Sequence, residues 1–361
     1  MDGMRLRLGL VTVLVPLIAI VLAVVGGRQA GESAAGDARS SLTVGFDSLP
    51  ADTQIAGFTD WSRIRRLLEV DEPRNAAERS ELVDGASLRD LSTRSVIGPY
   101  AEEMHNAYGW SAADLLWEAY GQGQASATMV ARLDDSVSRA TIRSNLTKLG
   151  YVRDGRVWSI RADTSAVSSD LASTLGAIAL VPDRDLVIAA SEAAQVSEVL
   201  GTIDRDTPSL LSVRSAADVT RALAGADSVL VQAGPSACRS TTLETQDAEV
   251  LSQARAALGR ADALVEPEFA GRALDGGTRS SEVMRFAFGF RSPSIAAQQA
   301  KTRASLAVGP FIGRSGRVED SLVPLSSTAR GSTAVLRFRH DPDSTAYMTG
   351  EGPLLFAGCP L

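Results

Sequence analysis

Cysteine, histidine and lysine are all scarce in this chain of 361 residues. Two cysteines and two histidines are too few for a zinc finger, an iron–sulfur centre or any site built on several imidazoles. Only Lys148 and Lys301 are lysines, and the rest of the 36 basic residues are arginines. Because alanine and glycine are also abundant, this arginine bias is typical of a GC-rich genome. Sites that bind phosphate or carboxylate through two guanidinium N–H groups are the alternative. Sites built on carboxylates or hydroxyls are not excluded.

Concentrated positive charge is also lacking. The chain has 36 basic and 43 acidic residues, a formal net charge of -7, and no segment combines a basic cluster with interleaved aromatic residues. We therefore expect no binding to nucleic acid. With 45% hydrophobic and 22% charged residues, the composition is ordinary for a globular protein, which argues against wholesale disorder and against a protein with many membrane spans.

One long uncharged run is present near the N-terminus, over residues 8–27, directly after Arg5 and Arg7. A helix of this length spans about 30 Å, the thickness of a bilayer core. The two arginines favour a cytoplasmic N-terminus and an exported remainder. We predict a cytoplasmic N-terminus and signal anchor over 1–27 and a flexible tether over 28–41. A cleaved signal peptide is the alternative, although its apolar region is usually shorter.

The predicted export bears on the oxidation state of the two cysteines, Cys238 and Cys359. An even pair in an exported chain predicts one disulfide. It would close a loop of about 120 residues, for which the chain-entropy estimate is roughly 4 to 5 kcal/mol. Two free buried thiols are the alternative.

The exported part shows a weak internal repeat of apolar patterns. Strand-like alternation and helix-like spacing predict the order βαββαβ twice, which is the order of a ferredoxin-like sandwich. The expected strands are 125–133, 156–160, 177–182, 185–191 and 228–234 in the first module and 283–290, 317–325, 332–340 and 353–358 in the second. The predicted fold class is α+β, with an N-terminal helical segment and first module over 42–239 and a linker helix and second module over 240–361.

His105 lies in a predicted helix, three residues after Glu102. At this spacing the two side chains share a helix face, so the carboxylate could orient the imidazole for acid–base chemistry. An ordinary surface pair is the simpler interpretation, because no nucleophile or metal-ligand spacing accompanies it.

His340, Asp341 and Asp343 cluster where a predicted strand ends. A histidine and two carboxylates there could hold a metal ion or act as acid and base. The simpler interpretation is a turn followed by a helix that Asp343 caps. Since no P-loop, nucleophile elbow or zinc-protease motif occurs either, we expect no catalytic residue, no metal and no cofactor.

Three segments carry a faint resemblance to a group of proteins: GFTDWSRIRRLL at 57–68, RDLSTRSV at 89–96 and GWSAADLLWEAYGQ at 109–122. With the predicted anchor, they resemble uncharacterised membrane-anchored envelope proteins of high-GC Gram-positive bacteria. The resemblance implies a location and no activity. We expect a single-pass cell-membrane protein with an extracellular C-terminal part that binds an envelope protein or another envelope component. Alternatives are a lipid or small-molecule binding protein and, less favoured, a hydrolase using His105 or His340.

Overall fold

The computed structural model describes residues 40–124, 127–160, 168–240, 247–259, 263–277, 282–313, 315–341, 348 and 354–360. Residues 41–361 form one compact unit. The predicted anchor over 8–27 lies outside the described residues. Within the described part, no helix has both the length and the apolar character needed to cross a bilayer.

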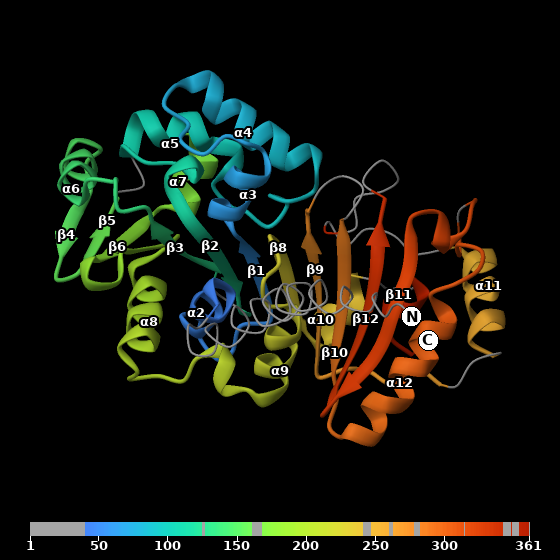
Figure 1. Cartoon of the computed structure of the whole chain (residues 1–361). Coiled ribbons are helices and arrows are strands. Elements are labelled where there is room, and N and C mark those ends of the chain that lie inside the picture. The colour runs from blue at the N-terminus through green and yellow to red at the C-terminus, as the bar shows by residue number, and fades with distance from the viewer. Residues whose placement is uncertain are drawn as a thin grey trace, which may run out of the picture. The chain divides into compact units, whose positions relative to one another are not determined.

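The strands of the described residues join in one sheet, in which each strand is antiparallel to its neighbours (Figure 1). In sheet order they are β11 (Leu322–Arg330), β12 (Thr333–His340), β10 (Val283–Gly289), β9 (Phe269–Asp275), β8 (Ser228–Ala233), β1 (Ile55–Thr59), β2 (Leu115–Gln122), β3 (Ala127–Leu133), β7 (Leu186–Ala190), β6 (Ala177–Val181), β5 (Val157–Ser159) and β4 (Val152–Asp154). The predicted α+β class, with a large antiparallel sheet, is confirmed at this level.

Helices cover both faces of the sheet. The first face packs against α3 (Trp61–Leu67), α4 (Ala76–Leu88), α5 (Ala101–Tyr108), α6 (Arg139–Lys148), α7 (Ser169–Thr174), α11 (Ala248–Leu258) and α12 (Pro293–Leu306). The second face packs against α2 (Ser41–Asp47), α8 (Ala193–Asp204) and α9 (Arg214–Leu223). A further helix, α10 (Gly234–Ser240), follows β8. Burying apolar side chains on both faces is the main stabilising term of such a layered fold.

Helices α3, α4, α6, α11 and α12 each begin after a residue whose side chain caps the first turn. The side chains of Asp60, Asn75, Ser138, Asp247 and Ser292 each accept a hydrogen bond from a backbone N–H in the first turn that follows. Such caps satisfy N–H groups that have no partner inside the helix.

The internal repeat takes a different form from the one expected. Each half contains a hairpin, a helix and a second hairpin: β2–β3, α6 and β6–β7 in one half, and β9–β10, α12 and β11–β12 in the other. The halves lie as β2-β3-β7-β6 and as β9-β10-β12-β11 on either side of the central β8–β1 pair. The described structure therefore does not contain the predicted βαββαβ ferredoxin-like modules.

The difference has two main causes, a predicted strand that does not form and a strand that was not predicted. The expected strand at 353–358 is wrong, because Leu355–Ala357 forms a short 3-10 helix, η6, whose apolar side chains are all buried. The strand β9 was not expected, and it takes the place beside β10 that a ferredoxin-like module would give to its last strand. In the first half, a ferredoxin-like module would place β8 directly beside β3, but β1 and β2 lie between these two strands.

The predicted boundary between 42–239 and 240–361 does not divide the sheet. Strand β8 precedes this boundary and β9 follows it, yet they pair along their length, from Ser228 opposite Leu274 to Ala233 opposite Phe269. The two predicted modules are therefore halves of one continuous sheet.

Candidate functional site

A groove lies on the second face of the sheet, near the end that β11 forms. Its volume is about 460 Å³, within the range of small-molecule sites, roughly 300 to 1,000 Å³. We call it the arginine groove, after Arg285, Arg330 and Arg337. Its full lining is Ala222, Ala224, Gly225, Asp275, Val283, Arg285, Ser326, Thr328, Arg330, Val335 and Arg337.

The register of three neighbouring strands brings these side chains to one face. Arg285 of β10 lies opposite Arg337 of β12, which lies opposite Ser326 of β11. Two residues along, Val335 lies opposite Thr328. Because side chains alternate between the faces of a strand, the residues of these rows all point to the second face.

Among the described residues, this part of the second face has no helix over it, because α9 ends before it. Helix α9 packs against β8, β9 and β10 and reaches β12, whereas α12 covers β11 and β12 on the first face. Figure 1 shows β11 at the outer edge of the sheet, beyond β12. On the second face, Arg337 is exposed and Arg285 is half-buried. The groove is thus the boundary between the covered and the open parts of this face.

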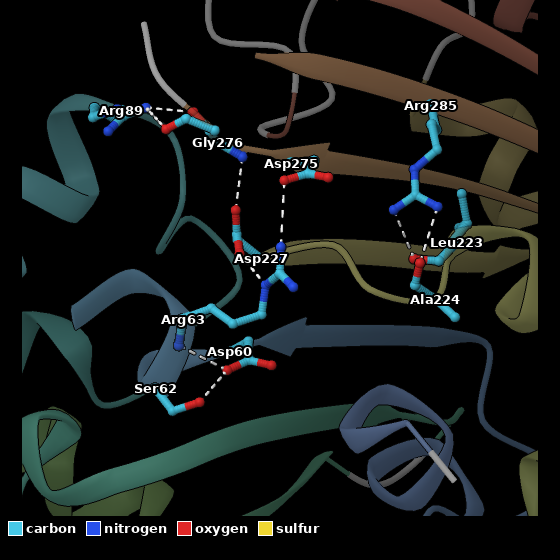
Figure 2. A network of polar contacts seen from close by, with 11 residues as sticks. Asp60, Ser62, Arg63, Arg89, Leu223, Ala224, Asp227, Asp275, Gly276 and Arg285 are labelled. Atoms are coloured by element: carbon cyan, nitrogen blue, oxygen red, sulfur yellow. Dashed lines mark hydrogen bonds and ion pairs between the residues drawn. The ribbon is translucent and has the colours of Figure 1, made fainter. Parts of the chain in front are cut away.

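Arg285 is held in place by the end of α9 (Figure 2). Its Nη1 donates to the carbonyl oxygens of Ala222 and Ala224, at 3.1 and 3.0 Å, and its Nη2 donates to that of Leu223 at 3.2 Å. A cation at a helix C-terminus satisfies free carbonyls and interacts favourably with the helix dipole. Burial lowers the pKa of Arg285, the negative charge of Asp275 raises it, and the positive charge of Arg337 lowers it by a smaller amount.

The acidic residue of the groove, Asp275, is already paired. Its Oδ1 lies 3.4 Å from Nη2 of Arg63, whose Nε lies 2.6 Å from Oδ1 of Asp227 (Figure 2). Asp227 Oδ2 in turn accepts from the backbone N–H of Gly276 at 2.7 Å. This network ties α3 to β9, and Arg63 neutralises the carboxylate beside the groove.

Arg330 and Arg337 make no ion pair among the described residues and are exposed. Arg339 lies on the same face of β12, opposite Val283. Arginines elsewhere meet carboxylates, as in the pairs of Arg205 with Asp47 and Arg139 with Asp185. Like charges on neighbouring strands repel, and no described carboxylate forms an ion pair with Arg330 or Arg337, so these two guanidinium groups can meet an anionic ligand. Guanidinium and hydroxyl groups together suit an oxyanion ligand.

His340 lies on the opposite side of β12 and is buried, with 5% of its surface exposed. Its Nδ1 lies 3.0 Å from Oε2 of Glu282, whose Oε1 accepts from Nη2 of Arg89 at 2.8 Å. Of the predicted partners, Asp341 donates its backbone N–H to the carbonyl oxygen of Ser321, and Asp343 lies outside the described residues. Throughout the described part, no three His, Cys, Asp or Glu side chains are placed to hold a metal.

The predicted pair of His105 and Glu102 does not form a hydrogen bond. The Glu102 carboxylate accepts from Nε and Nη2 of Arg79, at 3.1 and 2.9 Å, and from Nδ2 of Asn106. Nδ1 of His105 has no hydrogen-bond partner within the described part of the chain. Arg79 is the stronger competitor because a guanidinium can bond a carboxylate with two N–H groups. An acid–base role for this pair is therefore not supported by the geometry.

The predicted disulfide stays a prediction. Cys359 follows η6 and is half-buried. The backbone of Cys238 belongs to α10, but its side chain lies outside the described residues.

A second hollow, of about 440 Å³, lies on the first-face side of the molecule between α11, the end of α12 and the chain that follows. Most of its lining is apolar, including Leu306, Phe311 and Ile312. Val308 at its rim is 47% exposed. Its described lining residues include no charged side chain, so they offer an apolar ligand a contact surface.

The arginine groove was not predicted from the sequence, although part of its pattern is visible there. Arg337 and Arg339 alternate with apolar residues in the predicted strand 332–340, and Arg285 does so in 283–290. This pattern predicts a cationic strand face. It does not predict that the two strands are neighbours, because their register depends on the whole sheet.

No family model matches the chain, and no curated protein matches it. Among solved structures, it is similar to one described as crystal form III of TP0453, with a TM-score of 0.41, 6% identity and coverage of 87% of this chain and 99% of that chain. Crystal form I of TP0453 gives a TM-score of 0.37 and 7% identity, with the same coverage.

Proposed function

We propose that the protein is a single-pass, membrane-anchored protein whose extracytoplasmic part binds an anionic envelope partner and catalyses no reaction. The proposed anchor is the apolar run over 8–27, and the export of the remainder rests on Arg5 and Arg7. The observation that carries the binding role is the arginine groove, where Arg285, Arg330 and Arg337 line one hollow. In a chain of net charge -7, such a surface favours a negatively charged partner over a neutral one.

The groove suits binding better than catalysis. Ser326 and Thr328 supply hydroxyls, but neither a histidine nor a cysteine is found among the described lining residues. A nucleophilic hydroxyl requires an adjacent base, and Asp275 is paired with Arg63. The guanidinium groups can instead form charge-assisted hydrogen bonds to carboxylate or phosphate oxygens.

Photo-crosslinking of the full chain in its membrane tests this proposal. A photoreactive residue at Thr328 is expected to give an adduct that falls about tenfold when Arg330→Glu and Arg337→Glu are combined, because like charges now face the partner. Arg143→Glu, at an exposed position of α6, is the matched control and is expected to leave the yield unchanged. A yield at Thr328 that survives the double reversal would contradict the proposal.

The apolar hollow supports a second candidate, the binding of a lipid acyl chain. Its lining of Leu306, Phe311 and Ile312 would gain from contact with methylene groups, at about 0.8 kcal/mol for each one buried. Native mass spectrometry after gentle detergent extraction tests this candidate: a co-purified lipid that Leu306→Gln removes supports it, and a protein of apo mass counts against it.

A further inference from the structure

Strand β11 is an edge strand that pairs on one side only among the described residues, with β12. Its residues from Pro324 to Arg330 are exposed. An edge strand presents a row of N–H and C=O groups that another strand can bond, and proteins usually shorten, charge or cover such edges. The opposite edge, β4, has only three residues. Strand β11, with nine, is therefore the edge able to accept a further strand.

The accessible part of this edge is Ser326–Arg330. A bulge between Pro324 and Ser326 interrupts the register, and a proline within a strand removes one N–H. From Ser326 to Arg330 the pairing with β12 is regular and contains no proline. Leu325, at the bulge, is 53% exposed and offers an apolar contact beside this segment.

We propose that an extended acidic segment of a partner protein adds to β11 as an edge strand over Ser326–Arg330 and places alternate carboxylates over the arginine groove. This inference rests on the proposed function and names its partner. Strand addition of this kind combines backbone hydrogen bonds, which give affinity, with side-chain contacts on one face, which give specificity.

The geometry of a sheet places the carboxylates correctly. An added strand would lie about 4.8 Å from β11, so that alternate side chains on the second face stand beside Ser326, Thr328 and Arg330. Arg337 lies one strand further, about 10 Å away, and its long side chain reaches back toward the edge. Acidic residues at every second position of the partner would therefore meet Arg330 and Arg337.

A second copy of this chain is a poorer occupant than an acidic partner. The segment from Leu322 to Arg330 contains no aspartate or glutamate, so two β11 strands side by side would bring two copies of Arg330 to the same edge without compensation. A small anion is also a poorer occupant, because it would leave the N–H and C=O groups of Ser326–Arg330 bonded only to water.

Binding of a synthetic peptide to the full chain in detergent tests the inference. The probe is a nine-residue acetylated peptide amide in which glutamate alternates with threonine, with a leucine at one end. Two further peptides carry N-methyl groups on alternate amides, one on the odd and one on the even positions. Because an added strand turns only every second amide toward its neighbour, one N-methylated series is expected to bind about tenfold more weakly and the other about as well as the parent.

Variants of the protein separate this inference from the proposed function. Combined Arg330→Glu and Arg337→Glu are expected to weaken the parent peptide about tenfold, and Arg143→Glu is expected to leave its affinity unchanged. Equal affinity of both N-methylated peptides, with the charge reversal still weakening binding, would overturn strand addition but leave the anionic partner in place. Binding that the charge reversal does not change would overturn both. Peptide-independent dimerisation through β11 would assign the edge to a second copy and also overturn the inference.

Discussion

Replacing Glu282 by alanine is expected to lower the free energy of unfolding by about 3 to 5 kcal/mol. Its side chain is fully buried, with Oε1 accepting from Nε and Nη2 of Arg89, at 3.2 and 2.8 Å, and Oε2 lying 3.0 Å from Nδ1 of His340. Removal of the carboxylate leaves the Arg89 guanidinium, only 11% exposed, without its charge partner. It also disconnects the end of α4 from β12.

Urea unfolding of the full chain in detergent measures this loss. The matched control is Glu81→Ala. Glu81 is an exposed carboxylate on α4, the helix that Arg89 caps at its C-terminal end. The control is expected to change the free energy of unfolding by no more than about 0.5 kcal/mol. A loss below about 1 kcal/mol for Glu282→Ala would mean that the buried pair contributes little more than a surface one.

Replacing Glu118 by alanine is expected to cost about 3 kcal/mol, since it leaves several buried donors without an acceptor. The Glu118 carboxylate in β2 accepts from Nε1 of Trp61 at 3.3 Å, from Oγ of Ser95 at 2.5 Å and from the backbone N–H of Val96 at 2.6 Å. These bonds fasten the chain between α4 and α5 to the sheet. Thermal or urea unfolding measures the loss, and a variant as stable as the wild type would contradict the assigned role.

The same residue predicts a pH dependence of known sign. Burial raises the pKa of Glu118 above its ordinary value of 4.5, so the folded protein binds this proton more tightly than the unfolded chain does. Linkage then requires that the contribution of Glu118 to stability falls as the pH rises from 4.5 through the raised pKa. Glu118→Gln replaces the titrating carboxyl group by a neutral amide. As the pH rises, the stability advantage of the wild type over Glu118→Gln is therefore expected to shrink, or to change sign in favour of the variant. A difference that grows with pH would contradict the account.

Much of the local structure could be predicted from the sequence. Strands β7, β10 and β12 follow clear apolar patterns, and α12 begins at a serine cap, Ser292. These features depend on near neighbours in the chain. Strand β9 could not be found in this way, because its buried Arg272 interrupts the apolar pattern. Similarly, Leu355–Ala357 is apolar at every position, and such a run does not distinguish a strand from a buried turn.

The arrangement of the halves and the groove depends on distant residues. The pairing of β8 with β9 crosses the predicted domain boundary, and no local pattern specifies it. The groove exists because Arg285 and Arg337 are paired residues of the neighbouring strands β10 and β12, and because α9 ends beside Arg285. The histidine patterns in the sequence point to His105 and His340, and neither of these residues lines the groove.

The central claim is that the arginine groove binds anionic partners, and the affinity of the full chain for poly-L-glutamate tests it most directly. We expect the wild type to bind more weakly as salt rises, because the contact is electrostatic. Combined Arg330→Ala, Arg337→Ala and Arg339→Ala are expected to lower the affinity about tenfold at low salt and to flatten the salt dependence, while Arg143→Ala changes neither. Equal affinities of the triple variant and the wild type across the salt series would contradict the claim.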